Sequence, residues 1–69
     1  MESTEMVRVQ QYLRDKFGTD RIQLVLANRK DNSAEVHLSG EFIGVIFRDE
    51  EDGELSYAFH MAIMEEDLS

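Results

Sequence analysis

The stretch that most constrains this chain runs from Leu55 to Met64, ten residues without an acidic, lysine or arginine side chain. The whole sequence is strongly acidic, with 15 Asp and Glu against 7 Lys and Arg and a formal net charge of −8 at pH 7. Such a stretch is expected to be buried, because exposed apolar area is unfavourable in water. We interpret it as the strand on which the core is built, and as a candidate surface for recruiting a partner.

The length of the chain indicates a single domain, residues 1–69. A domain this small buries only about 60% of the surface that its unfolded chain exposes, so its core must be used fully. The chain has no cysteine, which excludes disulfides and cysteine-based metal sites, and two histidines cannot complete a structural zinc site. We therefore expect no cofactor.

No apolar run in the sequence approaches the roughly 20 residues needed to span a bilayer. The first five residues, Met-Glu-Ser-Thr-Glu, are acidic where a signal peptide would be basic. These two features predict a soluble cytoplasmic protein that does not contact a membrane.

The charge is distributed unevenly along the chain. Residues 1–34 contain six basic and five acidic residues, whereas residues 35–69 contain Arg48 and ten acidic residues. Nucleic-acid binding requires clustered Lys and Arg at the phosphates, so this distribution argues against a nucleic-acid partner. A basic protein partner is compatible with it, although an acidic surface also serves solubility alone.

The N-terminal segment, residues 4–17, has the periodicity of an amphipathic helix. Its apolar residues fall on one stripe: Met6, Val9, Leu13 and Phe17. Ser3 or Thr4 is expected to cap the helix, and Gly18 to end it in a left-handed conformation. We expect the apolar stripe to pack on the core.

The remaining sequence predicts four strands separated by polar or glycine-containing turns. The strands are expected at residues 22–28, 34–38, 41–49 and 55–64, followed by an acidic tail at 65–69. The predicted fold class is α+β, an N-terminal helix packed on a four-stranded, mostly antiparallel sheet with helix–strand–strand–strand–strand meander connections.

The turns predict the strand register. Ser39-Gly40 is typical of a two-residue hairpin loop, which places Val36 opposite Ile43 and Ala34 opposite Val45. For the next turn we favour a three-residue loop from Glu51 to Gly53 over a two-residue Asp52-Gly53 loop. The longer loop pairs apolar residues, namely Phe47 with Tyr57, Val45 with Phe59 and Ile43 with Met61. The shorter loop would pair Arg48 with Tyr57 and Val45 with His60.

This register predicts two sheet faces. The face expected to be covered by the helix consists of Ile22, Leu24, Leu26, Ala34, Val36, Leu38, Ile43, Val45, Phe47, Leu55, Tyr57, Phe59, Met61 and Ile63. The opposite face consists of Val25, Ala27, Glu35, His37, Phe42, Gly44, Ile46, Arg48, Ser56, Ala58, His60, Ala62 and Met64.

The second face contains a candidate polar cluster of Glu35, His37 and His60. The predicted row Glu35–Gly44–His60 would let the outer two side chains lean together over the glycine. A carboxylate beside an imidazole can perform acid–base chemistry near neutral pH or share a divalent ion. The alternative is an exposed face with ordinary cross-strand histidines, which the absence of a nucleophile or a phosphate-binding loop favours. We assign no catalytic residue and no metal ligand.

One helix of about 21 Å cannot cover four strands, and the final strand is expected to be an edge without charge or proline to block pairing. The economical solution is a homodimer that pairs the final strands or stacks the faces. The candidate interaction surface is Ser56, Ala58, His60, Ala62 and Met64. If the strand is instead central in the sheet, this reason for a dimer disappears.

The segment Gly40–Tyr57, continuing to Met61-Ala62-Ile63, resembles the central motif of a family of small uncharacterised proteins found mainly in alphaproteobacteria. Gln11-Tyr12-Leu13-Arg14 and Phe17-Gly18 are also similar to that family, so the resemblance covers nearly the whole chain. It implies a bacterial cytoplasmic protein of unknown function and assigns no activity.

The sequence thus leaves the function open and favours a small protein-interaction module, acting as a homodimer, over an enzyme. One alternative is a small-ligand, metal-binding or catalytic site at Glu35, His37 and His60. Another is an acidic regulator that docks a basic partner through residues 49–54.

Overall fold

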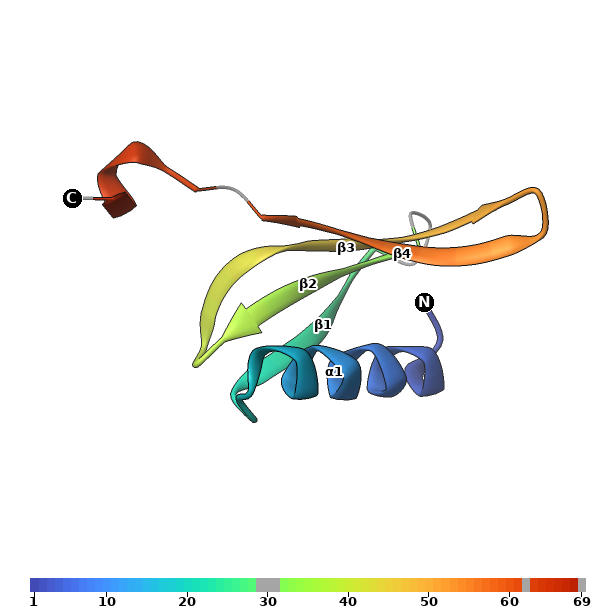
Figure 1. Cartoon of the computed structure of the whole chain (residues 1–69), viewed down its shortest axis with the longest axis horizontal. Coiled ribbons are helices and arrows are strands. Elements are labelled where there is room, and N and C mark those ends of the chain that lie inside the picture. Colours follow the sequence, from blue (N-terminus) through green and yellow to red (C-terminus); the bar gives the residue numbers. More distant parts are fainter. Residues whose placement is uncertain (29–31, 62, 69) are drawn as a thin grey trace.

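The fold is one N-terminal helix on a four-stranded antiparallel sheet with strand order β1-β2-β3-β4 (Figure 1), which confirms the predicted α+β meander. The computed structural model describes residues 1–28, 32–61 and 63–68, apart from the side chains of residues 27 and 28. The elements are α1 Ser3–Phe17, β1 Ile22–Asn28, β2 Ser33–Leu38, β3 Glu41–Glu51, β4 Glu54–Met61 and the 3₁₀ helix η1 Glu65–Leu68. A polar turn is predicted at residues 29–33; its residues 29–31, and Ala62 and Ser69, lie outside the described residues, whereas Ser33 belongs to β2.

The helix begins at Ser3, one residue earlier than a cap at Ser3 or Thr4 would allow. Glu2 is its N-cap, and the Glu2 N–H donates to Oε1 of Glu5 at 3.2 Å. The assignment of Ser3 or Thr4 as the cap was therefore wrong, because Ser3 already belongs to the helix. Gly18 ends the helix with φ of 66°, as predicted.

The helix lies along β1 and satisfies part of its backbone. The Leu24 N–H donates to Oε1 of Gln10 at 3.0 Å, and Nε of Arg14 donates to the Ile22 carbonyl oxygen at 2.8 Å. These bonds reach β1 from the side opposite β2, where an edge strand otherwise presents unpaired groups. Side chains of α1 thus cover the β1 edge of the sheet at Ile22 and Leu24.

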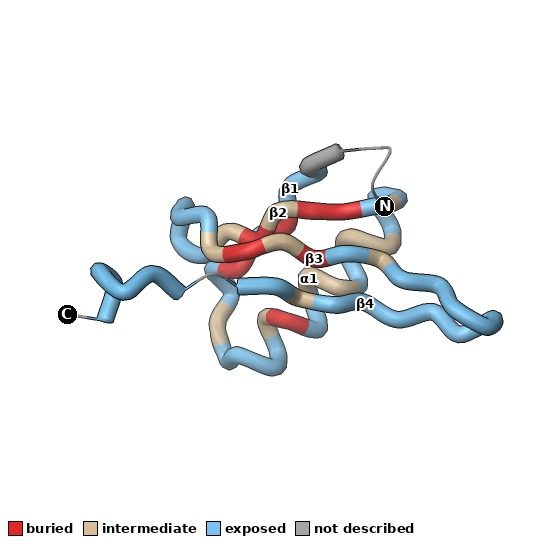
Figure 2. The backbone as a smooth tube through the Cα atoms, turned by 90° about the horizontal axis from the view of Figure 1, so that it is seen from above, coloured by how far each residue is buried: buried red, intermediate tan, exposed pale blue. Residues whose placement is uncertain are grey.

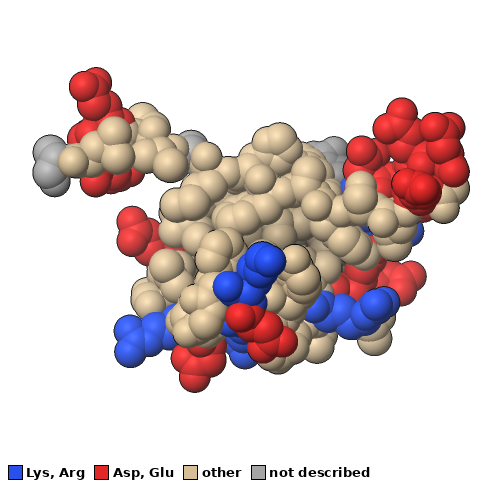
Figure 3. Space-filling view, in the orientation of Figure 1, with Lys and Arg blue, Asp and Glu red and all other residues tan. Residues whose placement is uncertain are grey.

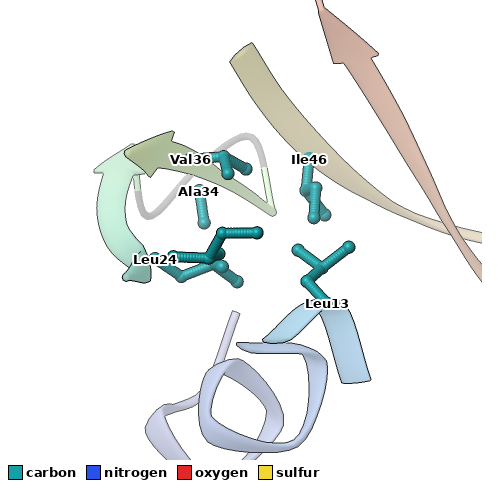
Figure 4. Close-up of a cluster of buried hydrophobic side chains, with 6 residues drawn as sticks. Leu13, Leu24, Ala34, Val36 and Ile46 are labelled. Carbon is teal, nitrogen blue, oxygen red and sulfur yellow. The ribbon is translucent and has the colours of Figure 1, made fainter. Parts of the chain in front are cut away.

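The buried core lies between α1 and the first three strands (Figure 4). Its fully buried apolar residues are Leu13, Ile22, Leu24, Ala34, Val36 and Ile46. Phe59 of β4 packs against this cluster but is only partly buried. The core is therefore centred on β1 to β3 rather than on the uncharged final strand.

The first hairpin contains a bulge that the sequence pattern did not predict. Ser39 and Gly40 form the expected two-residue turn with φ of 52° and 85°, the positive values of a type I′ turn. The register then shifts between Val36, which pairs with Gly44, and His37, which pairs with Phe42. Ile43 is the extra residue of the bulge, so Val36 does not face it as predicted.

The second hairpin has a two-residue loop, so the predicted three-residue loop was wrong. Glu51 pairs with Glu54, and the loop residues Asp52 and Gly53 have φ of 54° and 80°. A type I′ turn requires positive φ at both positions, which Asp and Gly tolerate, and its twist matches the flanking strands. The two pairs that the sequence reading rejected, Arg48 with Tyr57 and Val45 with His60, are those observed.

The two errors, of one residue each, cancel between β2 and β4, so they reverse the faces only of the part of β3 that follows the bulge. Ala34, Ile46 and Phe59 form one row on the helix side, where Val45 had been expected at the centre. Ile46 is accordingly 2% exposed, whereas Phe47, assigned to the core, is 40% exposed. Gly44 also faces the core, and a Cβ at this position would lie 2.4 Å from the His60 carbonyl oxygen.

The final strand β4 is the second edge of the sheet, and α1 leaves much of it uncovered (Figure 2). Leu55 and Met61, which share the helix side of β4, are 49% and 53% exposed. Its pairing with β3 continues from Glu54 to Met61 without a bulge. The strand ends at Met61 rather than at Met64, so Ile63 lies beyond the sheet instead of in the core.

Candidate functional site

Two members of the predicted polar cluster are in contact on the outer face of the sheet. Nε2 of His37 lies 3.0 Å from Oε1 of Glu35, two residues away on β2, and the His37 side chain is 23% exposed. The His37 ring also meets Phe42 edge to face, with centroids 5.8 Å apart. This pair can share a proton through its hydrogen bond.

The third member, His60, lies in the same row of the sheet as Glu35, but β3 separates the two residues. That row is Glu35, Val45 and His60, so the predicted glycine between them was wrong. The bulge at Ile43 turns Gly44 inward and puts the Val45 side chain where the gap was expected. The His60 ring instead packs edge to face against Phe47 at 5.4 Å. Among the described residues, no three His, Asp or Glu side chains are grouped to hold a metal ion.

The predicted interaction surface on β4 is only partly a sheet face. Ser56, Ala58 and His60 alternate with the core-side residues and are exposed. Met64 is exposed too, but it follows the end of the strand, and Ala62 lies outside the described residues. The larger apolar surface of β4 is on its other side, facing α1.

A charged network that the sequence reading missed links α1 to the last two strands. Oε2 of Glu5 accepts a hydrogen bond from the Tyr57 hydroxyl at 2.5 Å and lies 2.7 Å from Nε of Arg48. The Arg48 Nε atom is buried and makes no aligned hydrogen bond within the described residues, so its contact with Glu5 is an ion pair. Nη2 of Arg48 lies 3.2 Å from Glu50.

This network shifts the pKa values of its members. The hydrogen bond from Tyr57 lowers the pKa of Glu5; burial opposes this change, and the Glu2 N–H and Arg48 reinforce it. Burial, followed by the hydrogen bond to Glu5, raises the pKa of Tyr57. Burial alone would lower the pKa of Arg48, but the charges of Glu5 and Glu50 raise it. The signal in the sequence was Arg48 itself, a lone basic residue in the acidic half of the chain.

Beside this network, an apolar groove of about 550 Å³ runs between α1 and β4. We call it the α1–β4 groove, and its lining residues are Arg8, Val9, Tyr12, Leu13, Ile46, Leu55, Tyr57 and Phe59. Arg8 is the charged member of this lining. A more polar hollow of about 690 Å³ adjoins it at Arg8, Leu55 and Tyr57 and reaches Glu5 and Arg48.

Two groups of acidic side chains lie at opposite ends of the molecule, and other acidic side chains are spread over the lower part of this view (Figure 3). One group is the β3–β4 hairpin tip, with Asp49, Glu50, Glu51, Asp52 and Glu54; the other is the C-terminal segment, with Glu65, Glu66 and Asp67. Uncharged surface lies between them in this view.

Taken together, this region of the described residues offers an apolar groove beside the ion pair of Glu5 and Arg48. Within the described residues, no helix has both the length and the apolar character needed to cross a membrane. Among curated proteins and among solved structures, none matches the chain. Residues 5–67 match the family described as "Protein of unknown function (DUF3126)". Since this match covers most of the chain, the protein belongs to the DUF3126 family.

Proposed function

We propose that this protein is a non-enzymatic protein-interaction module that acts as a homodimer through β4. The observation that supports the proposal most directly is the exposed helix side of β4, where Leu55 and Met61 are about half exposed. These residues adjoin an edge strand that has no Lys, Arg or Pro between Leu55 and Met61 and no bulge. Proteins usually block such an edge by one of these devices, since an open edge pairs with other strands.

The total surface area supports the same proposal. The chain exposes 5484 Å², whereas a compact 8.0 kDa monomer exposes about 4,450 Å². The excess of about 1,000 Å² is similar to the roughly 800 Å² that each partner contributes to a standard interface. A second copy would therefore cover about as much surface as the fold leaves in excess.

Analytical ultracentrifugation from 1 to 200 μM tests the proposal. We expect a concentration-dependent dimer that Met61→Lys weakens at least tenfold, since a lysine on the edge opposes strand pairing and apolar contact. Val7→Lys is the matched control, because Val7 is also an exposed apolar residue but lies on α1. A monomer at every concentration, or an equal effect of both substitutions, would contradict the proposal.

A second candidate function is ligand or metal binding at Glu35, His37 and His60. The contact between Glu35 and His37 favours it, although Val45 stands between Glu35 and His60. Titration with Zn²⁺, followed by the imidazole signals in a ¹H–¹⁵N spectrum, tests this candidate. Saturable changes in both rings at one equivalent would support it, and an unchanged His60 would reject the three-residue site.

A third candidate is docking of a basic partner on the acidic hairpin tip. Its five acidic residues are exposed and lie at one end of the molecule. This mode of binding predicts capture of a polybasic peptide that weakens steeply between 50 and 300 mM NaCl, because salt screens exposed charges. Replacement of Glu51 and Asp52 by Asn or Gln should reduce it, whereas the same replacement of Glu65 and Glu66 should not.

A further inference from the structure

The C-terminal segment has the composition of a ligand for an apolar groove. After β4 it leaves the helix and sheet and extends away from them, as two views of the chain show (Figures 1 and 2). Ile63, Met64 and Leu68 are all exposed, and Leu68 is 74% so. The Asp67 N–H donates to the Met64 carbonyl oxygen at 2.9 Å, so η1 winds the segment into a turn. Met64 and Leu68 thus lie at the two ends of this short turn, with its acidic residues between them.

The α1–β4 groove has the complementary composition. Its lining is apolar along Leu13, Ile46 and Phe59, and its charged member is Arg8. The C-terminal segment has apolar side chains for such a lining, and it carries Glu65 and Asp67 as acidic residues for Arg8. Opposite charges of this kind select orientation more than they add affinity.

Pairing of two β4 strands across a two-fold axis places these two surfaces together. Such an interface is isologous, and its central strands run antiparallel. The Met61 end of one β4 then lies beside the Leu55 end of the other. The segment that follows Met61 therefore emerges next to the partner's Leu55, between the partner's acidic hairpin tip and its groove, and Arg8 in the groove lining favours the groove over the tip for the segment's carboxylates.

We propose that, in the homodimer, the segment Ile63–Leu68 of each copy lies in the α1–β4 groove of the other copy. This inference rests on the proposed homodimer and adds the identity of the groove's occupant. It accounts for two exposed apolar features of one chain, the segment and the groove, by a single reciprocal contact.

Isotope-filtered NOE spectra of a dimer mixed from labelled and unlabelled chains test the contact directly. We expect intermolecular NOEs between the methyl groups of Ile63, Met64 and Leu68 and the rings of Tyr12 and Phe59. NOEs between these groups within one chain, without intermolecular NOEs, would contradict the placement of the segment in the partner's groove. So would a spectrum of the dimer in which the segment shows no NOE to the groove.

Sedimentation of two variants separates this inference from the homodimer itself. Met64→Ser combined with Leu68→Ser should weaken the dimer at least tenfold, whereas Val7→Ser, at an exposed apolar residue of α1, should leave it unchanged. A peptide of residues 62–69 should then compete with the wild-type dimer. If the double variant dimerises with unchanged affinity, the C-terminal segment does not occupy the partner's groove, and the homodimer proposal stands. If the wild-type protein is a monomer, both proposals are wrong.

Discussion

At the scale of single residues, Glu5 connects three elements of the fold. Its carboxylate accepts hydrogen bonds from the Glu2 N–H and the Tyr57 hydroxyl and pairs with Arg48. We expect Tyr57→Phe to lower the free energy of unfolding by about 1 kcal/mol, less than the roughly 1.5–3 kcal/mol of a hydrogen bond to a charged group, because Tyr57 is 36% exposed. Urea denaturation measures this loss. Tyr12→Phe is the control for loss of a tyrosine hydroxyl and should be neutral, because Tyr12 is 61% exposed and the substitution keeps the ring that lines the α1–β4 groove.

The same network predicts a pH dependence of stability. The pKa of Glu5 is lowered from its ordinary 4.5, so the stability that it contributes is present above pH 4.5 and is lost as the pH falls through the folded-state value. The pKa of Tyr57 is raised from its ordinary 10.0, so its contribution is present below pH 10 and is lost as the pH rises further. We expect Tyr57→Phe to reduce the acid-side loss and to remove the tyrosine's alkaline loss. Unfolding curves of both proteins between pH 3 and 11.5 would show this, and parallel profiles would contradict it.

At the scale of elements, Gly44 allows β4 to lie close to β3. A Cβ at Gly44 would come within 2.4 Å of the His60 carbonyl oxygen and 2.6 Å of Cε1 of Phe59. The oxygen belongs to the backbone and cannot turn away, so we expect Gly44→Ala to destabilise the fold by roughly 1–3 kcal/mol. Ser56→Ala, on the exposed face of β4, is the control for a small change in the same strand pair. Equal stability of both variants in urea would show that β4 can shift without loss.

The elements also show what the sequence could predict. Helix periodicity, Gly18 and the Ser39-Gly40 turn have local chemical causes, and they were predicted correctly. The orientation of β3 was not, because Phe42–Phe47 is apolar on both faces and its alternation does not distinguish them. The bulge at Ile43 and the Asp52-Gly53 loop each moved the register by one residue, which inverts a strand. The Glu5 network and the row through Val45 depend on that orientation, so neither was predictable.

At the scale of the whole molecule, charge and apolar surface oppose each other in self-association. Each copy has a formal net charge of −8, so two copies repel at long range while their apolar surfaces attract. We expect the homodimer to tighten as NaCl rises from 20 to 200 mM, because the Debye length falls to about 8 Å near 0.15 M. Sedimentation equilibrium at the two salt concentrations measures the change. An affinity that falls with salt would indicate that ion pairs dominate the interface.

The side chains that cover β1 also limit how large an assembly can become. Gln10 and Arg14 already bind the backbone of β1 at its outer edge, whereas β4 ends the sheet on the other side. Two copies joined by β4 would therefore form an eight-stranded sheet with a covered β1 at both ends. In such a dimer a further strand could pair with β1 at Ile22 and Leu24 only by displacing these side chains, which opposes growth beyond two subunits. The helix thus covers the core and also occupies backbone groups of β1 that an added strand would need.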